Sequence, residues 1–398
     1  MRERHAEVSD VFSYSYEEAN EKYNFSPRQQ IVASHIMNCR TAEMGAYVYQ
    51  CEECGHEYIT YCSCRDRMCP KCQSDAHHKW IEKMMKIVLD CIHLHVVVTV
   101  PECLNRIALA NKELFYSLLF EVAVSAVLTL CRDRKHLGAT PGITAILHTW
   151  GQKLTFHPHI HLAVTAGGLT DDGKWKNAKR TKKGDVYLIP VKALARIVKK
   201  QMFKKLRESK KKGLLIFDDT EFEKILKEAD TKEWISYCKE PFKGSGGVFA
   251  YIGNYTHRSA IANSRIRSVS KDKVTFQYRD YADGNKQKLL TLSNIEFIRL
   301  VLQHVLAKGF VRIRHYGLYA VPNRKKRLKA AREQLSVEKQ QKPPAEKEEG
   351  RKTEEEALPF VYRCPCCGGI MYRRNSTPLS KKAIITLMAA RFVEPLPP

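Results

Sequence analysis

Two pairs of closely spaced cysteines constrain this chain more than any other feature of its sequence. Cys51 and Cys54 form one Cys-x-x-Cys pair, Cys69 and Cys72 form a second, and fourteen residues separate the two pairs. Each pair places two thiolates on one tight turn, and two such turns supply the four ligands of a tetrahedral zinc site. The spacing therefore predicts one four-cysteine zinc ribbon near the N-terminus.

Further metal-binding groups lie close to these pairs in the sequence, namely Cys39, Cys62, Cys64, His35 and His56. They are consistent with a second metal site and equally with thiols of an ordinary core, and both interpretations stay open. The N-terminus, MRERHAEVSDVF, is polar and lacks the apolar core of a signal peptide, so secretion is not expected. Clustered cysteines in a chain that is not secreted are expected to bind metal rather than to form disulfides.

The charge balance indicates a polyanionic partner. Lysine and arginine number 67 against 43 acidic residues, which gives a formal net charge of +24. Such an excess attracts nucleic acid before any motif is considered. Residues 114–131 approach the length of a membrane span, but Glu121 lies in their middle, so we expect a buried core helix and no membrane segment.

Four regions differ in composition, and we take them as a zinc- and DNA-binding module, a catalytic-size domain, a charged linker and a tail, at residues 1–90, 91–321, 322–357 and 358–398. The third region has too few apolar residues to bury, so it is expected to be a solvated helix or a flexible linker. In the tail, Cys364 and Cys367 resemble half of a zinc knuckle. A closed site there needs ligands from elsewhere, and a metal-free tail remains the alternative.

The second region contains strand signals mixed with helical ones. Two β-branched runs, at residues 95–100 and 159–166, predict strands. The runs KVTFQYRDY and KQKLLTL flank Asp283-Gly284, which predicts a hairpin because glycine tolerates the positive φ of the turn. Strands and helices joined in this way predict an α+β fold with an antiparallel sheet.

A helix is expected to follow the hairpin. Ser293 and Glu296 have the spacing of a capping box, in which side chains satisfy the free amides of a first turn. Gly309 is suited to the left-handed cap of a helix, so this helix is expected to stop near it.

Histidines crowd the strand FHPHIHLAVT. Side chains alternate on a strand, so His159 and His161 share one face while Ile160 points to the other. Two neutral imidazoles on one face are a good start to a divalent-metal site. The triplet from His93 to His95 has the same pattern, so the pattern alone does not identify the site.

Two tyrosines follow in a segment with helical spacing. Tyr251 and Tyr255 are four residues apart and would share one face of a helix. Two tyrosines that simply pack into a hydrophobic core from one face of a helix would have the same spacing, so that interpretation is the alternative. Beside a two-histidine metal site in a basic chain, however, the pair suggests attack of a tyrosine hydroxyl on a phosphodiester, with the metal stabilising the developing charge.

Several motifs in order resemble one known family. They are CRTAEMGAYVYQCEECGHE, SCRDRMCPKCQ, HVVVTVP, HPHIHLAVTAGGL, YIGNYTHRSAIANSRI and CPCCGG. The chain in these motifs resembles the two-tyrosine HUH transposases of the insertion-sequence ninety-one family, which move DNA by a rolling-circle-like route. The resemblance spans most of the chain.

This resemblance implies an HUH nuclease domain with a central antiparallel sheet and flanking helices, preceded by the zinc module. It implies Mg²⁺ or Mn²⁺ at His159 and His161 and a 5′-phosphotyrosine link to Tyr251 or Tyr255. The substrate would be single-stranded DNA at the element ends and the target, in the bacterial cytoplasm and bound to the nucleoid. It also implies that the triplet containing His95 is a decoy.

The resemblance also implies a third metal ligand, for which the sequence offers two candidates. Gln152 lies near the start of the histidine strand, and His257 lies two residues beyond the second tyrosine, where a helical offset of two points away from the tyrosine face. The choice stays open.

Basic residues after these motifs are candidates for DNA contacts, namely Arg258, Arg265, Arg312 and Arg314. Tyr316 and Tyr319 lie between or beside them and could stack on bases. Charge runs are also common on solvated faces. Two other functions fit the same residues: a rolling-circle replication initiator with the same nuclease core, and a non-catalytic zinc-ribbon protein that binds nucleic acid. The sequence does not define the oligomeric state.

Overall fold

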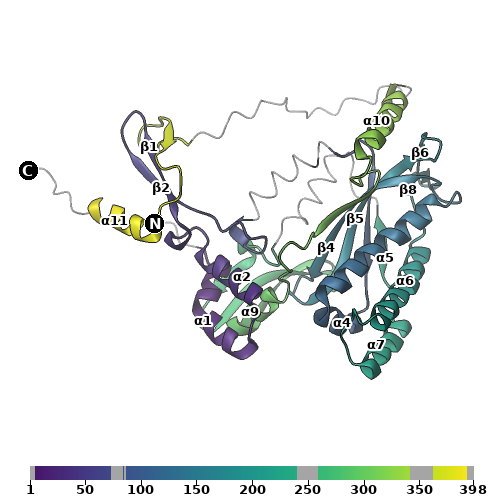
Figure 1. Ribbon diagram of the computed structural model, residues 1–398, viewed down its shortest axis with the longest axis horizontal. Coiled ribbons are helices and arrows are strands. Elements are labelled where there is room, and N and C mark those ends of the chain that lie inside the picture. Colours follow the sequence, from purple (N-terminus) through teal and green to yellow (C-terminus); the bar gives the residue numbers. More distant parts are fainter. Residues whose placement is uncertain (1–4, 73–83, 85–86, 240–258, 341–361, 392–398) are drawn as a thin grey trace, which may run out of the picture.

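A computed structural model describes residues 5–72, 84, 87–239, 259–340 and 362–391 of the chain. Its centre is an antiparallel sheet in the order β13-β4-β5-β3-β9, with the short β6 (Trp175–Asn177) paired to the far end of β5 (Figure 1). The five strands are β3 (His93–Thr99), β4 (Thr140–Trp150), β5 (Phe156–Leu169), β9 (Ser236–Lys239) and β13 (Ile313–Gly317). The predicted α+β architecture with an antiparallel sheet is confirmed.

Helices cover one face of this sheet and leave the histidines on the other. Leu94, Val96 and Val98 alternate along β3 and pack into the main hydrophobic core. That core is closed by four helices, which are α4 (Asn105–Ala110), α5 (Lys112–Arg132), α6 (Val191–Lys211) and α7 (Asp219–Thr231). Because strand side chains alternate, the residues between these apolar positions point to the opposite face.

Helix α5 is the apolar segment that approached the length of a membrane span. It is the single helix in the described residues that is long and apolar enough for one, and 67% of its apolar window is buried inside the protein. Helix α5 contacts β4, β5 and α6, so it forms the centre of the main core. This is the buried core helix expected from its sequence.

A second hydrophobic core joins the N-terminal helices to the segment of residues 260–305. Helices α1 (Val8–Tyr23) and α2 (Pro27–Asn38) pack against α9 (Asn294–Leu302) and the sheet β10-β11-β12. Its strands are Ile266–Val269, Lys273–Asp280 and Lys286–Ser293. Two hydrogen bonds support this packing, from the Val8 amide to Asn263 Oδ1 at 3.1 Å and from Gln29 Nε2 to the Leu302 carbonyl at 2.9 Å.

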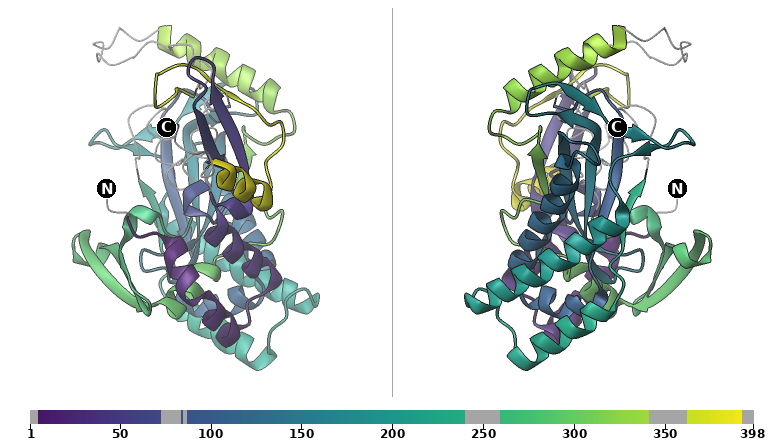
Figure 2. Two further views of the ribbon diagram at one scale, coloured as in Figure 1. Left: turned by 90° about the vertical axis from the view of Figure 1, so that its left-hand side faces the viewer. Right: turned by 90° about the vertical axis from the view of Figure 1, so that its right-hand side faces the viewer.

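A third sheet stands to one side of the central sheet (Figures 1 and 2). The strands β1 (Ala46–Cys51) and β2 (Glu57–Tyr61) form a hairpin, and β14 (Met371–Arg373) adds to its β1 edge. Helix α11 (Lys381–Arg391) follows β14, near the first helices of the chain (Figure 1). The sheet therefore combines segments from both ends of the sequence.

The predicted hairpin and helix start are confirmed, whereas the predicted helix end is wrong. Strands β11 and β12 flank Gly284, which has φ +58°, and the Ser293 hydroxyl accepts a hydrogen bond from the Glu296 amide at 3.3 Å. Helix α9 ends at Leu302 rather than near Gly309. Tertiary contacts end it, because Lys112 Nζ binds the Gln303 carbonyl at 2.8 Å and the Gln303 side chain binds the Leu154 carbonyl at 2.9 Å.

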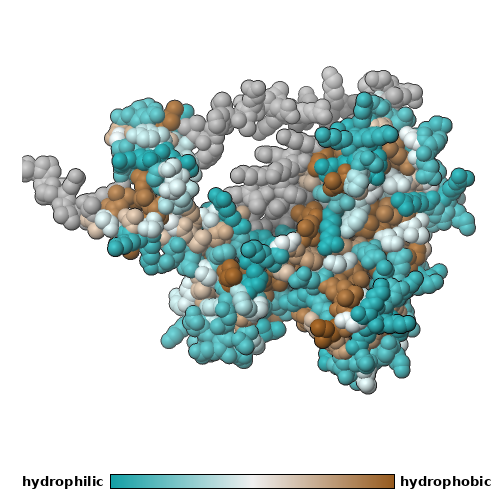
Figure 3. Space-filling view, in the orientation of Figure 1, coloured by the Kyte–Doolittle hydropathy of each residue, from teal (hydrophilic) through white to brown (hydrophobic). Residues whose placement is uncertain are grey.

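Hydrophilic side chains cover much of the face seen in Figure 3, with apolar groups in smaller patches. In the charged region after residue 321, α10 (Arg324–Gln340) is a helix, and among its residues 324–336 Leu328 and Ala331 are buried. The short pair β7 (Lys179–Arg180) and β8 (Val186–Tyr187) completes the strands.

Candidate functional site

Three histidines meet on the face of the central sheet opposite the core formed with α4, α5, α6 and α7. His148 ends the apolar run of β4, and the register of the two strands places it directly opposite His159 on β5. His161 lies two residues further along β5 on the same face. One ligand atom from each of His148, His159 and His161 lies within 4.8 Å of the others, close enough to hold one metal ion. The predicted pair of histidines is therefore joined by a third imidazole that sequence reasoning did not identify.

Hydrogen bonding and burial keep His159 and His161 in the neutral form that can coordinate a metal ion. His159 Nδ1 lies 2.7 Å from the His157 carbonyl, which can only accept, so Nδ1 carries the proton and Nε2 keeps its lone pair. Burial lowers the pKa of His159 to about 3, and the neighbouring His157 and His95 reinforce this shift. Burial and the nearby imidazoles likewise hold the pKa of His161 well below its usual range. Both rings are therefore neutral at physiological pH, the form that coordinates a cation.

The triplet on β3 divides into a core residue and a neighbour of the site. His93 is buried, and its Nδ1 donates to the Cys91 carbonyl while Nε2 accepts from the Tyr319 hydroxyl, both at 2.9 Å. His95 Nε2 instead lies 2.8 Å from His161 Nδ1, with the two rings stacked at 5.1 Å. His95 is therefore in direct contact with a candidate ligand, although the resemblance had implied that its triplet is unrelated to the site.

The other candidates for the active site lie elsewhere or cannot be placed. Gln152 Nε2 donates to the Tyr281 hydroxyl at 3.0 Å, at the turn between β4 and β5, and the histidine group does not include it. Tyr251, Tyr255 and His257 lie outside the described residues. The sequence signal for His148 is a histidine within a largely apolar strand. It is four residues from Thr144, so both point to the same face of β4.

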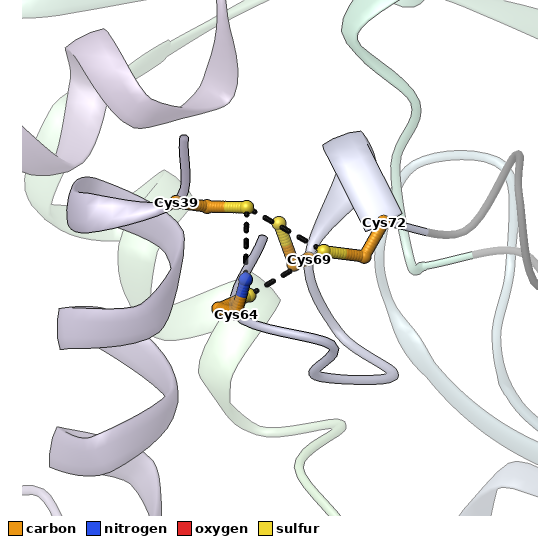
Figure 4. A group of neighbouring side chains, drawn as sticks. All are labelled: Cys39, Cys64, Cys69 and Cys72. Atoms are coloured by element: carbon orange, nitrogen blue, oxygen red, sulfur yellow. Dashed lines mark hydrogen bonds between the residues drawn. The ribbon is translucent and has the colours of Figure 1, made fainter. Parts of the chain in front are cut away.

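Four thiols near the N-terminal helices form a first cysteine cluster (Figure 4). Cys39 follows the end of α2, Cys64 lies in the segment after β2, and Cys69 and Cys72 bracket the next turn. The sulfur atoms of Cys39 and Cys72 are 3.4 Å apart, and those of Cys64 and Cys72 are 3.6 Å apart. A hydrogen bond with Cys64 and the amides of Cys72 and Lys71 lower the pKa of Cys69 to about 6, against the effect of burial.

The single zinc ribbon predicted from the two Cys-x-x-Cys pairs is not what the structure contains. Cys69 and Cys72 belong to the first cluster, whereas Cys51 and Cys54 join Cys364 and Cys367 in a second cluster. Cys69 and Cys72 take their partners from the nearby Cys39 and Cys64, whereas the pairing of β1 with β14 brings Cys51 and Cys54 to the distant Cys364 and Cys367. Among the described residues, neither cluster includes Cys62, His35 or His56.

The arginines proposed for DNA contacts differ in accessibility. Arg258 lies outside the described residues. Arg265 donates to the Gln277 carbonyl at 2.8 Å and also to the Gln152 carbonyl, so it holds the β10–β11 sheet to the β4–β5 turn. Arg312 is only 8% exposed, and burial lowers its pKa to about 10. Its position argues against the predicted contact with a DNA phosphate at the surface.

Arg314 and the tyrosines near it also occupy defined positions. The Arg314 guanidinium is half-buried and lies 4.2 Å from the centre of the Phe120 ring. Tyr319 is fully buried, with its hydroxyl accepting from the Leu89 amide at 3.2 Å, so the prediction that it stacks on bases is wrong. Tyr319 follows β13 and lies in the core, where its hydroxyl is 2.9 Å from His93 Nε2 on β3.

Comparisons with known proteins agree with this arrangement. A model described as "Transposase zinc-binding domain" (Zn_Tnp_IS91) matches residues 11–100, and one described as "Putative transposase" (Y2_Tnp) matches residues 142–327. "Putative transposase y4qJ" of Sinorhizobium fredii (strain NBRC 101917 / NGR234) is 38% identical over 91% of this chain and 92% of its own length. The chain belongs to the insertion-sequence ninety-one family of transposases.

A second relative of this transposase is the "Transposase for insertion sequence element IS801" of Pseudomonas savastanoi pv. phaseolicola. It is 28% identical over 72% of this chain and 68% of its own length. No solved structure gives a significant match. The first cysteine cluster lies within the zinc-binding match and the histidine group within the transposase match. The transposase therefore acts on DNA and carries structural zinc.

Proposed function

We propose that this transposase cleaves and rejoins single-stranded DNA through a 5′-phosphotyrosine intermediate, and so moves its element by a rolling-circle-like route. In this proposal residues 91–321 form an HUH-type nuclease domain. The observation that carries it is the group of three imidazoles on adjacent strands, which β4 and β5 align by register. The tyrosines lie outside the described residues, so their role rests on their spacing and on the family motifs.

The histidine group fits a divalent cation. Three donor atoms within 4.8 Å of one another suit one ion, and the proton on His159 Nδ1 leaves Nε2 as the donor. His148, His159 and His161 would hold Mg²⁺ or Mn²⁺. When bound, the cation would stabilise the negative charge that builds on the scissile phosphate during attack.

The reaction itself is an exchange of phosphodiester bonds. The phenolic oxygen of Tyr251 or Tyr255 attacks the phosphorus and loses its proton to solvent. The bond from phosphorus to the 3′ oxygen breaks, and that oxygen takes a proton and leaves as a 3′-hydroxyl. A 3′-hydroxyl of the target can then attack the phosphotyrosine and release the phenol. Two tyrosines permit two linked cleavages by one protein molecule.

The DNA substrate would be the two element ends and the target strand, in the bacterial cytoplasm. Arg258 and Arg314 would contribute to backbone binding, supported by the overall charge of +24. Binding that depends on phosphate contacts weakens steeply with added salt. The salt dependence of oligonucleotide binding in Arg314→Gln therefore measures that contribution.

Covalent capture tests the proposal. The purified protein is incubated with Mn²⁺ and a labelled single-stranded oligonucleotide of an element end, and then denatured in detergent. We expect a labelled protein band that Tyr251→Phe with Tyr255→Phe abolishes. Tyr14→Phe is the matched control, because Tyr14 is a 60% exposed tyrosine on α1.

Two outcomes would contradict the mechanism. A covalent band that persists in the double variant would assign the nucleophile to another residue. Binding of the cognate oligonucleotide without any covalent band, whichever metal is supplied, would favour a zinc-ribbon protein that only binds nucleic acid.

A further inference from the structure

The second cysteine cluster takes its four thiols from opposite ends of the sequence. Cys51 Sγ lies 3.4 Å from Cys367 Sγ, and Cys54 Sγ lies 3.5 Å from Cys364 Sγ and 3.4 Å from Cys367 Sγ. All four sulfur atoms lie within 4.8 Å of one another. Four sulfurs that surround a zinc ion at its usual bond length are about 3.8 Å apart. The cluster therefore has close to the size of a tetrahedral tetrathiolate site.

The two halves of the cluster have the same backbone conformation. In CEECGH the Gly55 amide donates to the Cys51 carbonyl, and in CPCCGG the Gly368 amide donates to the Cys364 carbonyl, at 3.2 and 2.9 Å. The Cys51 and Cys364 amides in turn donate to the carbonyl five residues later, at 2.9 and 2.8 Å. Gly55 and Gly368 have φ +71° and +78°, which glycine adopts without strain. Each half is thus a complete thiolate knuckle, and each supplies two ligands.

Strand pairing holds the two knuckles against each other. Strand β14 pairs antiparallel with β1, with Cys51 opposite Met371 and Tyr49 opposite Arg373. The rings of Tyr49 and Tyr362 are 4.5 Å apart, and the Tyr372 hydroxyl donates to Gln50 Oε1 at 2.8 Å. Figure 1 shows this C-terminal segment beside β1. The fold therefore brings the second knuckle to the first without a contribution from the central sheet.

We infer that Cys51, Cys54, Cys364 and Cys367 bind one structural Zn²⁺, which makes the C-terminal segment 362–391 an integral part of the N-terminal zinc module. The family model for that module ends at residue 100 and thus contains only one of the two knuckles. Four thiolates in a tetrahedral arrangement favour zinc over harder cations. The transposase then carries two structural zinc ions, one in each cysteine cluster. This inference does not depend on the nuclease mechanism.

Zinc stoichiometry tests the inference on the full-length protein. Zinc is measured by mass spectrometry after purification and exhaustive dialysis, and Cys366→Ser is the matched control because Cys366 is exposed and outside the cluster. We expect the same zinc content in the wild type and in Cys366→Ser, and one equivalent less in Cys367→Ser. Circular dichroism and oligonucleotide binding check that the variants remain folded. An unchanged zinc content in Cys367→Ser would overturn the inference.

A combined variant tests whether the two knuckles share one ion. Cys54→Ser and Cys367→Ser should each lose one zinc, and the double variant should also lose only one. Loss of two equivalents in the double variant would mean that each knuckle binds its own zinc, contrary to the inference. Cys69→Ser combined with Cys367→Ser should lose two, because those thiols belong to different clusters.

Attachment of the tail gives a second readout. A specific protease site is inserted between residues 341 and 361, and the cut protein is passed over a sizing column. The fragment from residue 362 should stay bound in the wild type and in Cys366→Ser, and dissociate in Cys367→Ser or after chelation. A fragment that stays bound equally in all four cases would show that zinc does not join the two ends.

Discussion

Replacing His148 by alanine is the most direct test of the three-histidine site. His148 is 4% exposed on β4 and lies opposite His159, so its loss leaves two imidazoles, both from β5. Removing even a residue that only orients a metal ligand costs about 10- to 100-fold in affinity. A ligand itself should cost at least the upper end of that range. We therefore expect the Kd for Mn²⁺ to rise about 100-fold or more, equivalent to about 2.7 kcal/mol.

His157→Ala is the matched control for this change. Its ring lies 5.1 Å from that of His159 but is not part of the three-histidine group. The contact that orients His159 comes from the His157 carbonyl rather than its side chain, so alanine preserves it. Mn²⁺ affinity in this control should stay near that of the wild type.

Calorimetric titration of zinc-loaded protein with Mn²⁺ measures both variants. Zinc content and circular dichroism establish that the fold is intact, and the Mn²⁺ dependence of covalent capture gives an independent midpoint. Wild-type Mn²⁺ affinity in a folded His148→Ala protein would refute the reasoning, because the register of β4 and β5 would then place His148 beside the site without a function in it.

Three further changes test other parts of the structure. His95→Ala should weaken Mn²⁺ binding about 10- to 100-fold, measured by the same titration, because His95 would orient His161 through their 2.8 Å contact. Burial lowers the pKa of His304 in the folded protein to about 3, whereas an unperturbed histidine in the unfolded chain has a pKa of about 6.5. As the pH drops below about 6.5, the unfolded chain is protonated at this residue and the folded protein is not, so the free energy of unfolding falls. In His304→Gln, denaturant titrations between pH 6.5 and 4 should show that the free energy of unfolding falls less steeply with pH than in the wild type, by up to about 1.4 kcal/mol per pH unit. Gly142→Ala should cost about 1–3 kcal/mol in thermal unfolding, because its Cβ would lie 2.7 Å from the Tyr319 ring; an unchanged midpoint would contradict that close packing.

Local patterns predicted local structure well. The β-branched runs predicted β3 and β5, and Asp283-Gly284 predicted the hairpin of β11 and β12. These signals act over a few residues, where turn geometry and side-chain alternation decide the outcome. The same alternation placed His159 and His161 on one face correctly.

Contacts between distant segments could not be predicted in the same way. The thiols of Cys51 and Cys367 are 316 residues apart in sequence, and the partner of a Cys-x-x-Cys pair depends on which strands meet. His148 joins the histidine pair only through the register of β4 and β5. The burial of Arg312 is likewise decided by tertiary packing, because its residue type alone predicts exposure.

The pairing of β1 with β14 affects how the protein is made. During translation β1 leaves the ribosome long before Met371 and its neighbours are synthesised, so one edge of the β1–β2 hairpin has no strand beside it for most of that time. A copy of the gene shortened at its 3′ end would encode a chain in which that edge stays open permanently. Such a truncated product should be prone to aggregation and proteolysis, so the cell would tend to accumulate only full-length transposase.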